Sequence, residues 1–349
     1  MAQFLSPFED FGFLPKEKGL EPEPKKVDSV VTDKIIFDLR KRLNSTKRSQ
    51  RLSAAWEISK LKDERLLPIL KKALMSEEDK GVLSELISAF VHYPEKDAVA
   101  ELSRFVFQAK DKELRKKVIW VFSHFVSSKE SFSALRNLAL TDPEPTVRKE
   151  AVFALGEIAN PQAIEVLREV LLTDEKANVR KLAVWSLGQF NDSGAEWLNK
   201  ALHEDVSSEV RREAAWILGK KRIVSSLSDL KEALKRESIL KVLEVIIWSI
   251  AQIAPKELRN IIFILEEDYS SKLKAEYIWL LGRFSQAQVL KKVAKNYWGS
   301  PSNVKRALIW ALSQAKANFA PRYLRQWYKK EKKKSLKEKI MWAMGKGGN

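Results

Sequence analysis

The chain has 349 residues, of which 45% are hydrophobic and 31% charged, so it can bury a core and still present a charged surface. It contains no cysteine, which excludes disulfides, thiolate metal sites and cysteine nucleophiles. Only 12 Gly and 12 Pro leave little room for long loops, and the balance favours an all-α protein.

Residues 1–30 differ in composition from the rest of the chain. Two aromatic stretches, at residues 5–8 and 11–15, contain Pro, and a Glu-Pro-Glu-Pro run follows at 21–24. We expect no regular structure in this segment. It has neither the basic start nor the apolar core of a signal peptide, and no apolar run in the chain approaches the roughly 18 residues of a membrane span. The expected location is therefore the cytoplasm, without membrane insertion.

A short pattern recurs along the rest of the chain. It reads Ala-Val-Phe-Ala-Leu-Gly at 151–156, Ala-Val-Trp-Ser-Leu-Gly at 183–188 and Ala-Ala-Trp-Ile-Leu-Gly at 214–219. We call the third residue of each copy its anchor, and successive anchors lie 31–33 residues apart. The anchors are Trp56, Ile87, Trp120, Phe153, Trp185, Trp216, Trp248, Trp279, Trp310 and Trp342.

Each repeat predicts two helices joined by a turn, and the second helix carries the anchor. A single hairpin cannot bury its own apolar faces, so neighbouring hairpins must stack into one continuous core. We therefore predict an all-α, right-handed α-α superhelix, a solenoid of about ten hairpins. It is expected to form a single domain over residues 31–345, followed by a short flexible tail at 346–349.

Charged residues recur in register with the anchors. An acid stands eleven residues before the anchor in six repeats, and Arg or Lys stands five residues before it in eight. The acid can accept from the first N–H groups of the second helix and can pair with the base. We predict a structural ladder that ties adjacent hairpins. Its clearest members are Asp142 with Arg148, Asp174 with Arg180 and Asp205 with Arg211.

The stretch Asp-Pro-x-x-x-Val-Arg-x-x-Ala-x-x-x-Leu-Gly at residues 142–156 resembles the short HEAT-like repeat of the phycobilisome-lyase type. The resemblance is strongest in the fourth to sixth repeats and weakens toward both ends. It implies a curved solenoid whose second helices line the concave side. It implies little about function, because scaffolds, adaptors, lyase subunits and nucleic-acid binders all use this repeat.

The sequence lacks the residue patterns of catalytic and metal sites. Its three histidines, His92, His124 and His203, lie in three different repeats without the spacing of metal ligands. Neither a phosphate-binding glycine loop nor a Gly-x-Ser-x-Gly motif occurs. We predict no catalytic residue, no cofactor and no metal. Membership of a lyase or other modifying enzyme, or DNA glycosylase-like activity, ranks last among the alternatives.

The anchors define a candidate binding surface. At about 100° per residue, Phe153 falls about 155° from the core stripe of its helix, and the same holds for Trp185 and Trp216. The residues four positions before and after the anchors are mostly polar or basic. Two interpretations remain open: the rings pack between neighbouring second helices, or they contact a ligand.

Positive charge gathers at the C-terminal end, where residues 290–349 hold 16 Lys and Arg against two Glu, +14 of the chain's +17. Such an imbalance implies an anionic partner. We therefore predict a non-enzymatic scaffold that binds an acidic protein or peptide in its concave groove. Nucleic-acid binding by the basic C-terminal repeats is the alternative, and the oligomeric state stays open. The predicted partner-binding residues are Trp216, Trp279, Trp310, Trp342, Arg212, Lys220, Arg283, Arg306 and Lys346.

Overall fold

The computed structural model describes residues 31–125, 128–158, 160–262, 264, 269–315 and 318–346. Within these ranges all the regular elements are helices, and none of the helices is long and apolar enough to cross a membrane. The predicted fold class, an all-α solenoid of helical hairpins, is confirmed. The expectations for residues 1–30 and for residues 347–349 of the tail concern residues outside these ranges, whereas Lys346, the first residue of the predicted tail, is the last residue of a helix.

The chain divides into two compact units, residues 1–170 and 171–349. The prediction of one domain over residues 31–345 stays a prediction. The elements of the first unit, with α9 crossing its boundary, are α1 (Asp33–Leu43), α2 (Arg48–Leu61), η2 (Glu64–Leu66), α3 (Leu67–Ser76), α4 (Lys80–Ala89), η3 (Phe90–His92), α5 (Glu95–Gln108), α6 (Lys112–Phe122), α7 (Lys129–Thr141), α8 (Pro145–Ile158) and α9 (Ala163–Thr173).

The second unit continues the same alternation of first and second helices. Its elements are α10 (Ala177–Leu187), η4 (Gly188–Gly194), α11 (Ala195–Glu204), α12 (Ser208–Lys221), η5 (Val224–Ser226), α13 (Leu227–Arg236), α14 (Leu240–Ile253), η6 (Pro255–Ile261), α16 (Ser271–Arg283), α17 (Ala287–Ala294), α18 (Ser302–Gln314), α19 (Ala320–Lys330) and α20 (Lys334–Lys346).

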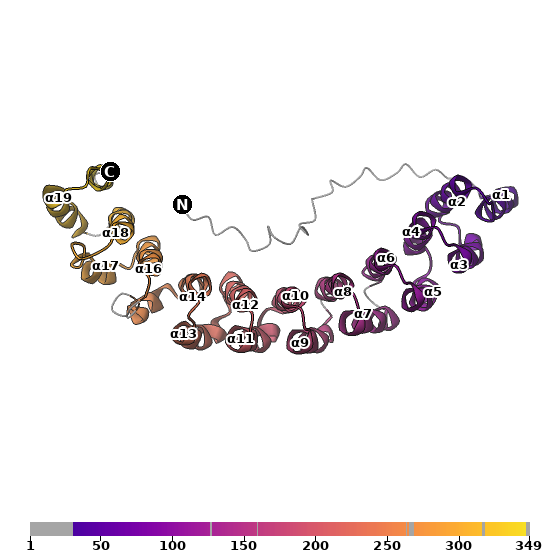
Figure 1. Ribbon diagram of the computed structural model, residues 1–349, viewed down its shortest axis with the longest axis horizontal. Helices are drawn as coiled ribbons and strands as arrows, with labels where there is room; N and C mark the ends of the chain where they lie inside the picture. The colour runs from indigo at the N-terminus through magenta and orange to yellow at the C-terminus, as the bar shows by residue number, and fades with distance from the viewer. Residues whose placement is uncertain are drawn as a thin grey trace. The chain divides into compact units, whose positions relative to one another are not determined.

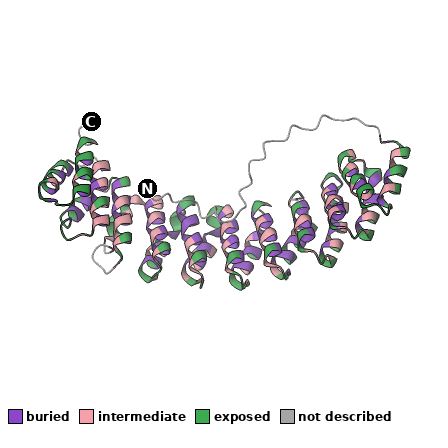
Figure 2. Ribbon diagram, turned by 45° about the horizontal axis from the view of Figure 1, so that its top comes forward, coloured by how far each residue is buried: buried purple, intermediate pink, exposed green. Residues whose placement is uncertain are grey.

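In each unit the first helices form one layer and the second helices form the other (Figure 1). Every anchor lies in a second helix, which confirms the division into repeats. In α4 the predicted anchor Ile87 is fully buried and Ser88 lines the surface beside Trp56 and Trp120, so the register of this repeat was predicted one residue too early. The buried positions gather where the two layers meet (Figure 2). Acidic caps start several second helices: Asp79 accepts from the amide of Val82, and Asp111 accepts from the amide of Leu114.

The glycine that ends the repeat pattern lets neighbouring second helices approach closely. A Cβ added at Gly219 would lie 2.6 Å from the Cα of Ser249, and one added at Gly282 would lie 2.5 Å from the Cα of Ala311. Both obstacles are backbone atoms of the next second helix, which cannot rotate away. The pairs α12–α14 and α16–α18 therefore depend on glycine at these positions.

Replacing Gly282 by Ala is expected to lower the free energy of unfolding by about 2 kcal/mol, because the new methyl group forces α16 and α18 apart. Gly345 is the matched control, since it is also helical but nothing lies within 4 Å of the Cβ position. Gly345→Ala is expected to leave stability unchanged or raised, because Ala favours the helix. Urea denaturation of both variants measures the difference, and equal effects would contradict the close-approach explanation.

Candidate functional site

The second-helix face, meaning the surface of the second helices turned away from the first helices, carries the anchors. Their exposure varies widely along the chain. Trp56 and Trp120 are 55% and 42% exposed in the first unit, and Trp342 is 46% exposed in the second. Trp216 is only 7% exposed. The anchors are therefore not a uniform row of exposed rings.

In the second unit the predicted Trp residues pack against their neighbours. Trp279 and Trp310, from adjacent repeats, stack with ring centroids 5.2 Å apart and planes 17° from parallel. Both are half-buried, and Trp216 is buried. Packing between second helices, one of the two interpretations left open by the sequence, therefore describes these three rings.

The predicted basic residues surround these rings. Lys220 holds its ammonium 4.4 Å from the ring centre of Trp216, and the guanidinium of Arg283 lies 5.5 Å from that of Trp279. Each is one helical turn after its Trp, and each is exposed. The rings thus hold cationic groups at fixed places on the surface.

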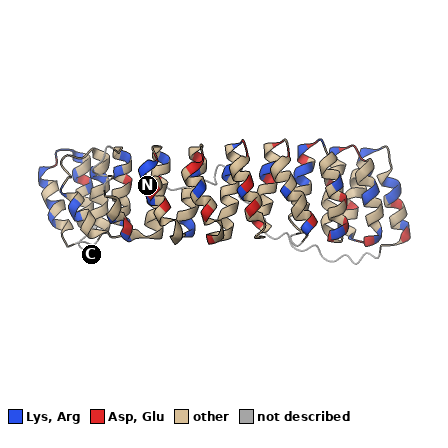
Figure 3. Ribbon diagram, turned by 90° about the horizontal axis from the view of Figure 1, so that it is seen from below, with Lys and Arg blue, Asp and Glu red and all other residues tan. Residues whose placement is uncertain are grey.

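The remaining predicted residues differ in their surroundings. Arg212 is half-buried and pairs with Glu209 at 2.7 Å, so its charge is largely compensated. Arg306 is exposed on α18, while the side chain of Lys346 lies outside what the structure describes. Lys and Arg are prominent on the C-terminal helices in Figure 3. Whether these residues bind a partner stays a prediction.

A groove in the first unit was not predicted. It encloses about 730 Å³ and is lined entirely by residues of α2, α4, α6 and the turns that follow the last two. Trp56 and Trp120 flank it. Lys60 lies 5.6 Å from the ring centre of Trp56, and Lys117 lies 4.6 Å from that of Trp120. The combination of ring and cation seen in the second unit thus recurs here around an open hollow.

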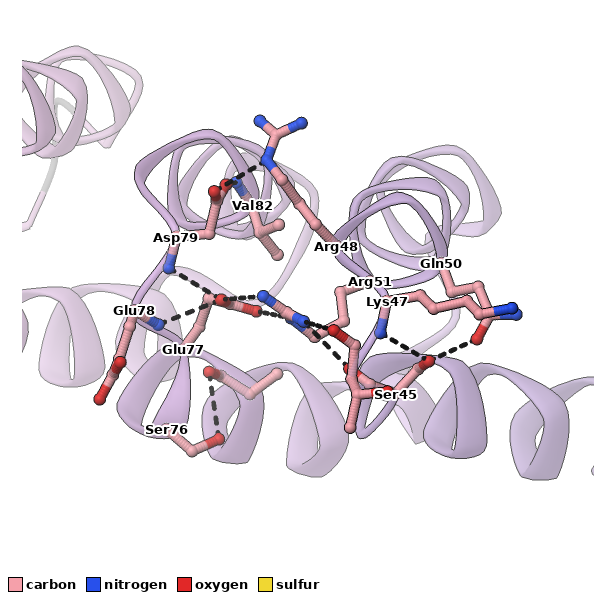
Figure 4. Close-up of polar contacts among 12 residues, drawn as sticks. Ser45, Lys47, Arg48, Gln50, Arg51, Ser76, Glu77, Glu78, Asp79 and Val82 are labelled. Carbon is pink, nitrogen blue, oxygen red and sulfur yellow. Dashed lines mark hydrogen bonds and ion pairs between the residues drawn. The ribbon is translucent and has the colours of Figure 1, made fainter.

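The charged ladder is present, with different partners from those predicted. In Figure 4 the guanidinium of Arg51 on α2 faces the carboxylate of Glu77, which lies in the turn of the next repeat, at 2.7 and 3.1 Å. Glu77 also accepts from the amide of Asp79 at 2.8 Å. One acid thus ties the preceding hairpin to the start of its own second helix.

The same arrangement recurs along the chain. Arg180 donates to both oxygens of Asp205 at 2.8 and 2.9 Å, and to the backbone oxygen of Asp174 at 2.9 Å. The prediction that Arg180 pairs with the carboxylate of Asp174 in its own repeat is therefore wrong, whereas the prediction that the ladder ties adjacent hairpins is confirmed. Further pairs of this kind are Arg115 with Asp142, Arg211 with Glu237 and Lys305 with Glu331.

The described residues contain no cluster of three or more His, Asp or Glu side chains arranged to hold a metal ion. Of the histidines, His92 and His124 both line the groove of the first unit, although they come from different repeats. His203 lies in the second unit, 3.3 Å from Asp229. The sequence placed the three histidines in separate repeats, and it gave no sign that two of them share a groove.

Comparisons with known proteins identify the repeat. The family model for HEAT repeats matches residues 132–218. No curated protein matches the chain in sequence. A mutant of Kap121p aligns with a TM-score of 0.64 and 14% identity, covering 92% of this chain and 42% of that one. The chain is therefore a HEAT-like repeat protein, as predicted, and it spans less than half of the length of this structural relative.

Two further solved structures are similar to this chain. The karyopherin Kap121p bound to the SUMO protease Ulp1p aligns with a TM-score of 0.62 and 15% identity, covering 91% of this chain and 42% of that one. The complex of CpcE and CpcF of phycocyanin lyase from Nostoc shares 19% identity over 66% of this chain and 97% of that one, with a TM-score of 0.37. At these identities the likeness to the karyopherin shows the fold alone, and the likeness to the lyase is too weak to carry an argument.

Proposed function

We propose that this chain is a non-enzymatic scaffold that binds an acidic segment of a partner protein along its second-helix face. The observation that carries the proposal is the repeated placement of a cation over an anchor ring. It occurs at Trp56 and Trp120 in the first unit and at Trp216 and Trp279 in the second. Trp and Arg are enriched among the residues that contribute most of the binding energy of interfaces.

The physical argument rests on pre-organisation. A lysine or arginine on a bare surface samples many rotamers, and binding has to fix one of them. A cation that already lies over an indole ring loses less freedom when it meets a carboxylate. Kap121p, which has a similar fold, is bound to a protein in its solved complex, and this supports a protein partner over a small molecule.

The proposal predicts that charge reversal at Arg283 and Arg306 weakens the binding of an acidic peptide. We expect the double variant Arg283→Glu, Arg306→Glu to bind a labelled polyglutamate peptide about tenfold more weakly, a change of about 1.4 kcal/mol. Both side chains are exposed, so folding should be preserved. Fluorescence anisotropy at low and at physiological salt measures the affinity, which should fall as salt rises.

The matched control is the double variant Lys291→Glu, Lys292→Glu on α17. It changes the net charge equally and replaces two exposed residues of the same unit, but in the first-helix layer. Full affinity in this control together with loss in the other variant supports binding on the second-helix face. Equal losses in both would show diffuse attraction to the basic end of the chain and would overturn the proposal.

Nucleic-acid binding is the second candidate, and it is favoured by the net charge of +14 over residues 290–349. The two candidates differ in their dependence on salt. A single strand that contacts several phosphates would bind with a steep linear loss of log affinity against log salt, whereas a peptide with a few carboxylates would show a shallow one. Titration with labelled oligothymidylate in the same assay separates them.

A further inference from the structure

The groove of the first unit owes its shape to an interruption in the series of aromatic anchors. Ile87, the anchor of α4, is fully buried, and the small Ser88 lines the groove in its place. The helices on either side, α2 and α6, pack against α4 and carry Trp56 and Trp120. By contrast, the successive Trp anchors Trp279 and Trp310 stack on each other with ring centroids 5.2 Å apart.

The groove carries positive charge that no acid of the described chain pairs with. Lys60 and Lys117 lie over the two Trp rings, and neither forms an ion pair within the residues that the structure describes. The one acidic side chain in the lining is Glu85, on the helix between them. Two ammonium groups therefore stand at the groove with their remaining N–H bonds free to meet an anion.

The histidines add directional hydrogen bonding. Nδ1 of His124 lies 2.8 Å from the backbone oxygen of Trp120, which can only accept, so Nδ1 carries the proton. Nε2 of His124 is then left to hydrogen-bond with a ligand such as a peptide backbone. Burial and the nearby Lys62 and Lys60 lower the pKa of His92, so His92 is neutral at physiological pH. A neutral imidazole can also exchange hydrogen bonds with a peptide backbone.

The dimensions suit an extended chain. Neighbouring packed helices lie about 8–10 Å apart, so a groove across α2, α4 and α6 spans roughly 20 Å. An extended peptide rises about 3.3 Å per residue, which corresponds to about six residues over this span.

We propose that this groove binds an extended segment of a partner protein that carries acidic side chains beside apolar or aromatic ones. The apolar side chains pack against the exposed edges of Trp56 and Trp120 over the floor formed by Ser88. The carboxylates meet Lys60 and Lys117. This inference rests on the proposed scaffold function and assigns it a specific site, which is in the other unit from Arg283 and Arg306.

A single-stranded nucleic acid fits the groove less well. Stacking of a base requires a free ring face, and Lys60 and Lys117 each lie over one face of Trp56 and Trp120, which leaves only the opposite face of each ring for a base. Glu85 would also repel the phosphates, whereas a peptide can place an N–H group there. The observations therefore favour a peptide.

The test uses the full chain and the double variant Trp56→Ala, Trp120→Ala. The probe is a labelled peptide rich in Glu and Phe, with labelled oligothymidylate as the comparison. Because both rings are about half exposed, the variant is expected to fold, and its thermal midpoint by circular dichroism checks this. The matched control is Trp298→Ala, which removes a ring of 42% exposure from the second unit.

We expect the double variant to bind the Glu- and Phe-rich peptide at least tenfold more weakly, and Trp298→Ala to stay within twofold of the unaltered chain. If the double variant does not fold, Lys60→Gln with Lys117→Gln replaces it with the same expectation. Unchanged peptide affinity in a folded variant would overturn the proposal. It would also be overturned if the unaltered chain bound oligothymidylate but not the peptide, and the variant lost the binding of oligothymidylate.

The two proposals fail in different ways. Suppose that Arg283→Glu, Arg306→Glu abolishes peptide binding and Trp56→Ala, Trp120→Ala does not. This result overturns the proposal that the groove binds the peptide, but it leaves the scaffold function with a binding site at Arg283 and Arg306. If only Trp56→Ala, Trp120→Ala abolishes binding, the result supports the groove as the peptide site and overturns the assignment of Arg283 and Arg306 as partner-binding residues. An acidic peptide that binds the unaltered chain nowhere overturns both.

Discussion

Replacing Arg180 by Ala is expected to lower the free energy of unfolding by about 3 kcal/mol, the lower end of the cost of breaking a buried ion pair. Arg180 donates to both oxygens of Asp205, and the side chains are only 11% and 5% exposed. Without the guanidinium, the Asp205 carboxylate stays buried, and the amide of Ser207 is its remaining donor among the residues that the structure describes. The effect is large because it leaves a charge uncompensated.

Arg236→Ala provides the control for this prediction. Arg236 pairs with Glu232 on the same helix, but its side chain is 72% exposed, so its loss should change stability by no more than about 0.5 kcal/mol. Chemical denaturation measures both variants. In a double-mutant cycle, Asp205→Ala should restore part of the loss in the Arg180→Ala background, because it removes the uncompensated charge. Equal small losses for Arg180 and Arg236 would contradict a stabilising ladder.

The repeat register could be predicted because each anchor is large and recurs at a fixed spacing. All the anchors lie in second helices, and the spacing of 31–33 residues holds throughout. The ladder was predicted only in part. Spacing along the sequence paired Arg180 with Asp174, six residues away, but the long Arg side chain reaches Asp205 in the next repeat. The number of residues between two side chains of one repeat does not indicate how close either of them lies to the next hairpin in space.

The sequence pattern of the ladder also did not include Glu77, the first acid of the series. Glu77 stands ten residues before its anchor, Ile87, rather than eleven, so it fell outside the pattern. Its role in the structure is that of the other acids, since it pairs with Arg51 and accepts from the amide of Asp79. The turn between α3 and α4 has three residues, as the turn between α7 and α8 has. Ser88, and not Ile87, stands eleven residues after Glu77, so the anchor of this repeat was predicted one position too early.

The exposure of the anchors could not be predicted from one helix at a time. A helical wheel places Trp216 away from the core stripe of its helix, yet the residue is only 7% exposed, because a wheel does not include what packs against the helix. For the same reason the groove was missed. Ile87 was predicted as the anchor of α4, but it is buried, and the small Ser88 lines the groove together with Trp56 and Trp120.

A buried acid provides the last prediction. Glu213 on α12 is fully buried, and neither of its carboxylate oxygens has a hydrogen-bond partner among the residues that the structure describes. Burial raises the pKa of Glu213 to about 7, against a smaller lowering by Lys181, Arg212 and Lys220 and a small contribution from Glu209 that adds to the rise. Folding therefore favours the protonated form of this side chain.

The pKa of Glu213 in the folded and in the unfolded chain determines how the stability of the protein depends on pH. The unfolded chain releases this proton near pH 4.5 and the folded chain near pH 7, so the folded state binds more protons between these values. Stability must then fall as pH rises through this window and level off above it. The difference between the two pKa values corresponds to about 3 kcal/mol.

Glu213→Gln keeps the shape of the side chain and removes its ionisation. We therefore expect the variant to gain about 3 kcal/mol relative to the unaltered chain between pH 4.5 and pH 8, with most of the gain complete by pH 7. Urea denaturation at several pH values measures this difference. Glu209→Gln, one turn earlier on α12 and about half exposed, is the control and should show no such growing gain. A constant difference between Glu213→Gln and the unaltered chain over this range would mean that the carboxyl is not buried as the structure places it.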